Sequence, residues 1–205
     1  MGYKNYSLTG FTEDVASAKP APGGGGVSAF VGALAISLGN MVGELTVGKK
    51  KYQDVEEQIQ EMMQKAKSLQ KELLELIDAD EECFLPLAKA YGLPKDHPSR
   101  QIIMEEALQT ACTAPMDIMR ACAKSIDLIE GFAKKGSKMA ISDAGCAAVL
   151  AKAALQAAVM NVYINAKSMK DRKYATGLIN DADHLLMEYC EKADTIYQKV
   201  TEEIR

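Results

Sequence analysis

A single apolar seam between residues 52 and 87 constrains the fold of this chain more than any other feature. Its members recur every three or four residues without a slip: Tyr52, Val55, Ile59, Met62, Ala66, Leu69, Leu73, Leu76, Asp80, Cys83 and Leu87. This spacing predicts one long amphipathic helix that packs in a bundle or coiled coil. Gly92 and Pro94 are stop signals that place its end near residue 91.

The other segments are also predicted to be helical. Two prolines and four glycines make the stretch 19–26 non-helical. Ser142–Asp143 offers an N-cap for the helix that follows it, and Pro115 is expected to kink or break its own helix. The expected helices cover residues 7–17, 27–47, 99–133, 143–168 and 179–204. The 205 residues therefore predict a single all-α domain, an antiparallel multi-helix bundle with long helices.

The composition narrows the class of protein. A formal net charge of -4 argues against a general nucleic-acid binder, which carries a basic face. The five cysteines form no CxxC pair, and most have apolar neighbours. They are predicted to be reduced core residues of a cytoplasmic protein, and the N-terminus lacks the pattern of a signal peptide.

Two helices are unusually apolar. The helix over 27–47 is interrupted by Ser37, Asn40 and Glu44, so we interpret it as a buried core helix and expect no membrane span. This helix and the alanine-rich helix over 143–168 have faces that one small bundle cannot easily cover. Burial against a second copy removes such a patch, so we expect a homodimer.

Asp80 is the sharpest chemical signal, because it is the charged member of an apolar seam. A carboxylate in that position costs free energy unless it is paired or protonated. Burial raises its pKa toward a value that suits proton transfer. Alternatively, Asp80 is a structural residue that bonds a neighbouring helix or fixes its register. Asp78 and Glu81 are expected to point to other faces and to be solvated.

Three further groups are candidate ligand contacts. Gly23, Gly24, Gly25 and Gly26 precede a helix, where free N–H groups suit an anion or a polar ring edge, or where a tight turn lets helices pack. Lys49, Lys50 and Lys51 form a basic patch that either attracts an anionic ligand or is a solvated loop.

Asn161 and Asn165 are four residues apart on one helix face. Buried amides of this kind either satisfy core groups or hydrogen-bond a heterocycle. The two histidines, His97 and His184, lie far apart and lack metal-ligand spacing, so no metal site is predicted.

Taken together, these motifs resemble the cyclodeaminase/cyclohydrolase family over nearly the whole chain. The segment that resembles the first stretch of the family's sequences is PAPGGGGVSAFVGALAISLGNMVGELTVGKKKY (20–52). The family's acidic helix and exit resemble DADEECF and LPK (78–84 and 93–95), and its alanine-rich helix resembles SDAGCAAVLAKAALQAAVMNVYINAKSMKD (142–171). Two positions depart from the family: Gly26 stands where Ser is usual, and Cys83 where Ala is usual.

The resemblance implies a helical bundle that pairs as a homodimer and acts on a reduced folate with an anionic glutamate tail. It implies Asp80 as the catalytic residue and no cofactor beyond the folate substrate. The substrate-binding residues that it implies are Gly23, Gly24, Gly25, Gly26, Lys49, Lys50, Asp143, Asn161 and Asn165.

Two reactions of the family fit these residues. A cyclohydrolase adds water to the cationic amidine carbon of 5,10-methenyltetrahydrofolate and gives 10-formyltetrahydrofolate. A cyclodeaminase closes the ring of 5-formiminotetrahydrofolate and releases ammonia. These 205 residues include no formiminotransferase domain to supply a formimino-folate, so we expect the cyclohydrolase, although a separate transferase could supply a stand-alone cyclodeaminase. A non-catalytic folate-binding helical dimer stays open as a third hypothesis, against which the charge of Asp80 in its seam argues.

Overall fold

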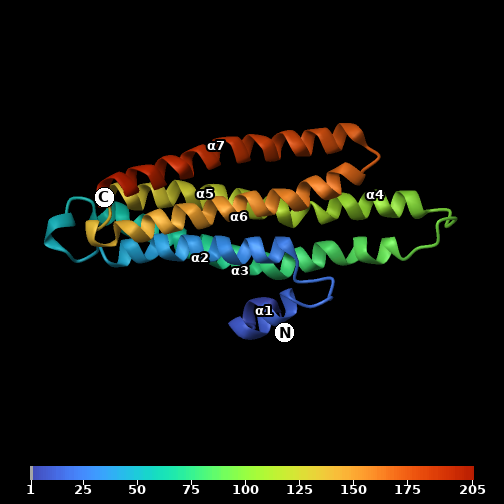
Figure 1. Cartoon of the computed structure of the whole chain (residues 1–205), viewed down its shortest axis with the longest axis horizontal. Helices are drawn as coiled ribbons and strands as arrows, with labels where there is room; N and C mark the ends of the chain where they lie inside the picture. The colour runs from blue at the N-terminus through green and yellow to red at the C-terminus, as the bar shows by residue number, and fades with distance from the viewer. Residues whose placement is uncertain (1) are drawn as a thin grey trace.

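The computed structural model describes residues 2–205, and every regular element in them is helical (Figure 1). The all-α prediction is confirmed. Three short 3-10 turns are η1 (Tyr3–Asn5), η2 (Lys50–Tyr52) and η3 (Lys138–Ala140). The α-helices are α1 (Leu8–Val15), α2 (Gly24–Glu44), α3 (Glu56–Tyr91), α4 (Arg100–Ala111), α5 (Thr113–Lys135), α6 (Ile141–Ser168) and α7 (Arg172–Ile204).

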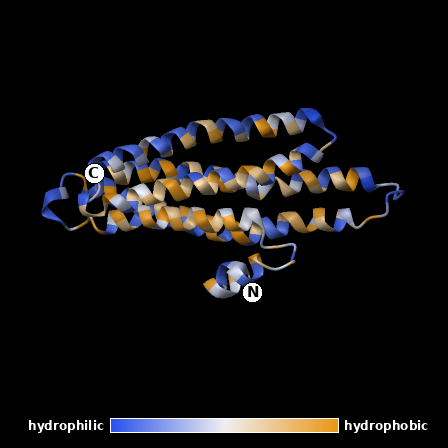
Figure 2. Ribbon diagram, in the orientation of Figure 1, coloured by the Kyte–Doolittle hydropathy of each residue, from blue (hydrophilic) through white to orange (hydrophobic). Residues whose placement is uncertain are grey.

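The long helices form one elongated bundle. Helices α2 and α6 lie side by side, α3 packs against α2, and α7 packs against α6, while α5 contacts all four. The short α1 lies outside the bundle near the start of α2 (Figure 1). Hydrophilic residues gather on α7 and on the end loops (Figure 2). Within residues 2–205, the side of α2 and α6 that carries the exposed Leu34 and Met160 has no neighbouring helix.

The seam that predicted α3 does face the core. Ile59, Leu73 and Leu87 are at most 1% exposed. The break predicted from Pro115 is also confirmed, because α4 ends at Ala111 and α5 begins at Thr113. Pro115 lies in the first turn of α5, where its missing N–H leaves no intrahelical bond unmade.

The predicted starts of the last two helices are wrong. The last helix begins at Arg172, seven residues before residue 179, because Asp171 caps it and accepts the N–H of Tyr174 at 2.9 Å. Helix α6 begins at Ile141, so Ser142 and Asp143 lie inside its first turn and do not cap it. A carboxylate in a first turn still interacts favourably with the helix dipole.

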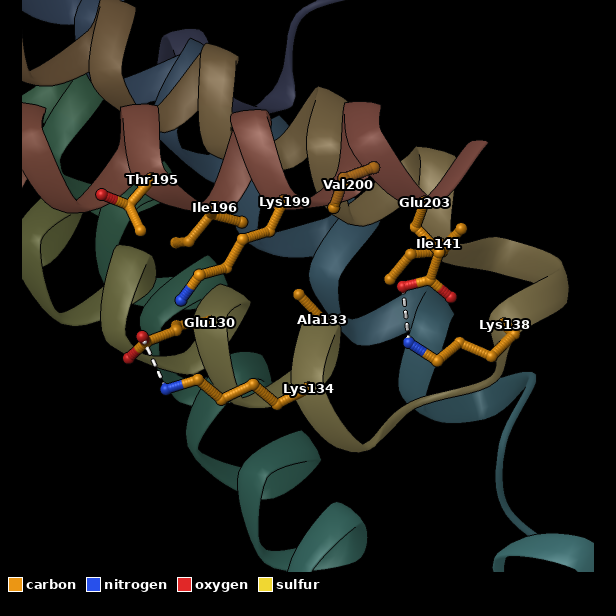
Figure 3. Close-up of a pocket in the computed structure, with 10 residues that line it drawn as sticks. All are labelled: Glu130, Ala133, Lys134, Lys138, Ile141, Thr195, Ile196, Lys199, Val200 and Glu203. Atoms are coloured by element: carbon orange, nitrogen blue, oxygen red, sulfur yellow. Dashed lines mark hydrogen bonds and ion pairs between the residues drawn. The ribbon is translucent and has the colours of Figure 1, made fainter. Parts of the chain in front are cut away.

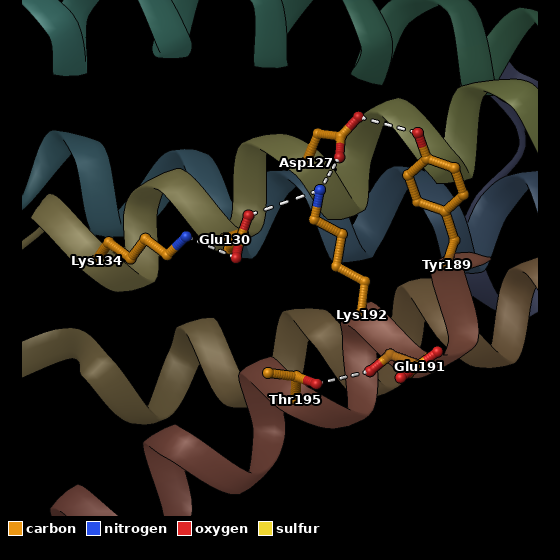
Figure 4. Close-up of polar contacts among 7 residues, drawn as sticks. All are labelled: Asp127, Glu130, Lys134, Tyr189, Glu191, Lys192 and Thr195. Carbon is orange, nitrogen blue, oxygen red and sulfur yellow. Dashed lines mark hydrogen bonds and ion pairs between the residues drawn. The ribbon is translucent and has the colours of Figure 1, made fainter.

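Polar contacts on the surface connect α5 to α7 (Figure 4). The ammonium of Lys192 donates to Asp127 and lies 3.6 Å from a carboxylate oxygen of Glu130. The hydroxyl of Tyr189 donates to Asp127 at 3.3 Å. Exposed ion pairs are worth roughly 0–1 kcal/mol each, so these contacts add little to the stability of the fold.

The apolar core has two parts. The larger cluster fills the bundle between α2, α3, α5, α6 and α7. The smaller one lies where α4 packs against the end of α3 and the turn between α6 and α7. Its buried members are Leu87, Ala90, Ala107, Leu108, Ala111, Cys112, Ala166, Met169 and Ala175. The break between α4 and α5 therefore falls at the junction of the two clusters.

Helices α2 and α6 are long and apolar enough to cross a membrane by length and composition alone. Inside the bundle, 56% of the apolar window of α2 and 44% of that of α6 are buried. The buried part agrees with the core-helix interpretation of 27–47.

Candidate active site

Asp80 lies on α3 and faces the start of α2. Its Oδ2 accepts a hydrogen bond from the backbone N–H of Gly26 at 2.9 Å. The first N–H groups of a helix have no intrahelical partner, and the helix dipole favours negative charge there. Asp80 therefore satisfies part of the N-terminus of α2 although it comes from another helix.

The glycine segment is partly helical, which corrects the expectation for residues 19–26. Gly24, Gly25 and Gly26 form the first turn of α2, and Gly23 is its N-cap. Glycine costs roughly 1 kcal/mol per residue in a helix interior, but at Gly25 no larger residue fits. A Cβ on Gly25 would lie 2.1 Å from Oδ1 of Asp80. The absence of a side chain thus lets the helix start approach the carboxylate.

The environment of Asp80 changes its acidity. Burial raises the pKa of this carboxyl above the usual value of an aspartic acid, and the hydrogen bond from Gly26 partly opposes that shift. A carboxyl with a raised pKa takes up and returns a proton closer to neutral pH than an exposed one. Asp80 is therefore suited to acid–base chemistry.

Asp80 opens into a cavity of about 180 Å³ between α2, α3, α5 and α6. Five of the predicted site residues come together there, because Gly23, Gly24, Asp80, Asn161 and Asn165 all line it. The remaining walls are Pro20, Ala21, Glu81, Phe84, Ala111 and Pro115. A hollow with apolar walls and a few convergent polar groups is the usual form of a small-molecule site.

The two asparagines present hydrogen-bond acceptors to this cavity. The amide nitrogen of buried Asn165 donates to the carbonyl of Ala111 at 3.2 Å, and that of Asn161 donates to the carbonyl of Ala157 at 3.2 Å. Within residues 2–205 neither amide oxygen has a protein donor. Together with the carboxylates, they make a pocket that suits a donor-rich or cationic ligand.

Two acidic residues lie where the sequence did not predict them. Glu81 lines the cavity and is not a solvated residue on another face. Asp78 is partly buried, and its Oδ1 has no hydrogen-bond partner in the described residues. Asp78 packs so closely against Gly2 that a Cβ there would lie 2.1 Å from its Oδ2. The sequence feature that could have predicted this position is the i,i+3 spacing of Glu81 and Phe84, which places both residues on one side of α3.

Three of the predicted contacts, Lys49, Lys50 and Asp143, lie at the other end of the bundle. Helix α2 separates the lysine loop from the glycine turn by about 30 Å, at 1.5 Å per residue. Lys49 donates to the hydroxyl of Ser137 at 3.2 Å, while Lys50 and Lys51 are exposed. Asp143, in the first turn of α6, is about 27 Å along that helix from Asn161. Within one chain, none of these residues reaches the cavity.

A second hollow lies near that end, between α5, α6 and α7 (Figure 3). Lys134 pairs with Glu130 at 2.7 Å, and Lys138 pairs with Glu203 at 2.7 Å. Because these ammonium groups already have anionic partners, we assign no ligand to this hollow. Among residues 2–205 no three His, Cys, Asp or Glu side chains cluster as metal ligands, and the expectation of no metal stays a prediction.

Comparisons with known proteins agree with one another. Residues 7–184 match the family model of formiminotransferase-cyclodeaminase. The chain is 39% identical to a methenyltetrahydrofolate cyclohydrolase of Methylorubrum extorquens over 98% of both chains. It is 29% identical to the mouse formimidoyltransferase-cyclodeaminase, of which it spans 34%. A solved formiminotetrahydrofolate cyclodeaminase of Thermotoga maritima superposes with a TM-score of 0.84, at 30% identity, over 97% of this chain and 98% of that one.

Proposed function

This chain belongs to the formiminotransferase-cyclodeaminase family, and from that premise we propose that it is a methenyltetrahydrofolate cyclohydrolase. It is an enzyme of the kind that opens and closes the one-carbon bridge of a tetrahydrofolate. The observation that carries the proposal is the partly buried Asp80, whose carboxylate meets the first turn of α2 inside a cavity.

The geometry supports a simple sequence of proton transfers. The carbon between N5 and N10 of the substrate is cationic, and Asp80 lies in an acceptor-rich pocket that stabilises such a charge. The Asp80 carboxylate takes a proton from water as the water attacks that carbon. The carboxyl then returns the proton to N5 as the bond from carbon to N5 breaks, and the hydroxyl proton of the water adduct passes to solvent, which leaves the formyl group on N10. The reverse direction uses the same groups.

The alternative reaction is cyclodeamination of 5-formiminotetrahydrofolate. The mouse relative and the Thermotoga protein are both named as cyclodeaminases, but the relative at 39% identity over 98% of this chain is named as a cyclohydrolase. Separate incubation with methenyl- and formimino-tetrahydrofolate, followed by absorbance, distinguishes the two. Loss of the methenyl chromophore without ammonia release from the formimino substrate is expected. Turnover of the formimino compound alone would assign the cyclodeaminase.

Glu81 is proposed to bind the substrate rather than to transfer protons. Its carboxylate lines the cavity and, within residues 2–205, has neither a hydrogen bond nor an ion pair. A carboxylate accepts two parallel N–H bonds from a planar amidine-type edge, which the pterin ring offers. Glu81→Gln is expected to raise KM by about 10-fold, the effect of roughly 1.4 kcal/mol, with little change in kcat. A lower kcat at unchanged KM would instead assign Glu81 to the chemistry.

We also propose that two copies of the chain form a homodimer. One side of α2 carries an exposed or half-exposed row, the α2 strip: Val27, Val31, Leu34, Leu38, Met41 and Leu45. Helix α6 carries an exposed row beside it, the α6 strip: Cys146, Val149, Ala153, Met160 and Ile164. Leu34 is 45% exposed and Met160 is 63% exposed. An apolar face of two adjacent helices is typical of an interface between subunits.

The dimer is tested by light scattering at micromolar concentration. The expected mass is twice 22.2 kDa. A charge at the centre of the α2 strip, Leu34→Glu, is expected to shift the mass toward one chain while the circular dichroism stays helical. A monomeric parent protein would contradict the proposal.

The lysine patch is proposed to hold the glutamate tail of the folate. Lys50→Gln with Lys51→Gln is expected to raise KM about 5- to 10-fold for a polyglutamylated substrate, since each exposed ion pair is worth up to roughly 1 kcal/mol. The effect is expected to be smaller for a monoglutamate and to shrink as salt rises, because salt screens exposed charges. Equal KM changes for both substrates at all salt concentrations would make the patch a solvated loop.

Two further parts of the proposal concern the cofactor requirement and the cellular location. Hydrolysis of the methenyl bridge needs only water and the folate, so we propose no additional cofactor. All five cysteines are unpaired, and Cys112 and Cys122 are buried, which supports the proposed cytoplasmic location.

A further inference from the structure

Two features proposed to bind one substrate lie at opposite ends of the molecule. The Asp80 cavity is at the start of α2, and the lysine loop follows its end, about 30 Å away. Lys50 and Lys51 are exposed, and no ion pair within residues 2–205 uses either of them. A lysine side chain spans only a fraction of this distance. The lysines of one chain therefore cannot contact a ligand seated beside Asp80 of the same chain unless the ligand itself spans the gap.

The α2 strip connects these two ends. It starts at Val27, one residue after the N–H that Asp80 accepts, and it ends at Leu45, just before the lysine loop. A two-fold axis across the middle of the strip pairs α2 with a second α2 that runs in the opposite direction. Full overlap of the strips then places Val27 against the partner's Leu45. In this register the partner's Lys50 and Lys51 fall beside residues 21–23, at the lip of the cavity.

Charge favours this pairing over the parallel one. The cavity end of α3 carries Asp78, Asp80, Glu81 and Glu82, and the other end of α2 carries the lysine loop. Antiparallel pairing brings each basic loop to an acidic end, whereas an axis parallel to the helices brings the two lysine loops together. Juxtaposed like charges disfavour an interface, and complementary ones select its register.

We infer that each active site is completed by the second subunit, with the partner's Lys50 and Lys51 at the mouth of the Asp80 cavity to bind the anionic tail of the folate. This inference rests on the proposed function for the identity of the ligand. The antiparallel pairing itself rests only on the α2 strip and on the charge at its two ends.

Cross-linking tests the pairing without any activity measurement. In a Cys146→Ser background, chains with Val27→Cys and chains with Leu45→Cys are produced separately and together. A disulfide-linked dimer is expected only when both variants are present, and Val31→Cys with Met41→Cys provides a second pair in the same register. Covalent dimers formed by each variant alone, or no covalent dimer in either pair, would overturn the antiparallel interface.

Complementation tests the shared site. An Asp80→Asn chain and a Lys50→Gln/Lys51→Gln chain are co-expressed with different tags, and the heterodimer is purified. If lysines act across the interface, one site of the heterodimer is intact, and its kcat/KM for the polyglutamylated substrate is about half that of the parent dimer. If they act within their own chain, the value is about half that of the lysine variant, which would overturn the inference.

The control is a heterodimer of Asp80→Asn with the parent chain, which has one intact site under either arrangement. A lysine variant with the kcat/KM of the parent would also overturn the inference, because no tail contact would then exist. If the parent protein fails to turn over methenyltetrahydrofolate, the proposed function is wrong. The cross-linking result still decides the pairing in that case.

Discussion

Asp80→Asn is expected to keep the helical fold and to lower the turnover of methenyltetrahydrofolate by about 10²–10⁴-fold, the usual contribution of general acid–base catalysis. The two side chains are nearly equal in size, and the amide oxygen still accepts the N–H of Gly26. The amide has no proton to exchange in the useful range and no charge to offset the one-carbon cation. Folate binding, measured by fluorescence or calorimetry, is expected to change much less than kcat.

The direction in which Asp80→Asn changes the thermal stability can be predicted. Burial raises the pKa of Asp80 in the folded protein, so the folded state holds the proton more tightly than the unfolded state. The resulting stabilisation is full below the ordinary pKa of an aspartate and is lost as pH rises through the raised value. At a pH above that raised pKa the parent has lost it, and Asp80→Asn is expected there to melt at the same temperature or higher.

The opposite pattern would contradict a catalytic Asp80: a lowered Tm with near-normal activity in the folded fraction. Glu82→Gln is the matched control, since Glu82 is exposed and two residues away on the same helix. Asp78→Asn is not a clean control, because an oxygen of Asp78 is buried against the N-terminal segment. Glu82→Gln is expected to leave kcat and Tm unchanged.

Gly25→Ala is expected to reduce activity by at least about 100-fold, close to the effect of removing the Asp80 carboxylate. Its new methyl carbon would lie 2.1–2.4 Å from three atoms of the Asp80 carboxyl group. Either Asp80 or the first turn of α2 must move, and displacements of about 1 Å in an active site cost on the order of 10² in rate. Steady-state kinetics and the Tm of the variant measure the two consequences.

Gly177→Ala is the control for this substitution. Gly177 also lies in a helix, but nothing lies within 4 Å of the Cβ that the change would add. It is expected to stabilise the protein by roughly 0.5–1 kcal/mol through helix propensity. Near-normal activity in Gly25→Ala would mean that the glycine turn does not position Asp80.

The sequence predicted the elements of the fold well because those elements follow from local patterns. The spacing through Ile59, Leu73 and Leu87 produces α3, and Pro115 produces the break between α4 and α5. The start of α7 was missed because Ile179 begins the visible amphipathic pattern, while the cap of the helix is Asp171. Capping depends on a single side chain and therefore leaves a weaker signal than periodicity.

The site was less predictable because it is assembled from separate helices. Asp80 stood out by its charge in an apolar seam, and its cavity includes Asn161 and Asn165 as expected. That Gly24–Gly26 are helical was not predictable, because the reason is a carboxylate more than 50 residues away along the chain. The contribution of Glu81 likewise depends on how α3 is rotated against α2 and α6.

The junction of the two apolar clusters has a consequence for how such an enzyme tolerates change. The cavity is lined by Ala111 from the smaller cluster, and Pro115 stands directly before Met116 of the larger one. The space for a ligand therefore lies at the boundary between two separately packed apolar clusters. It is not a cavity inside either cluster. Mutations that change the shape of the binding space need not remove apolar packing from either cluster. New substrate preferences can therefore accumulate here with little loss of folding stability.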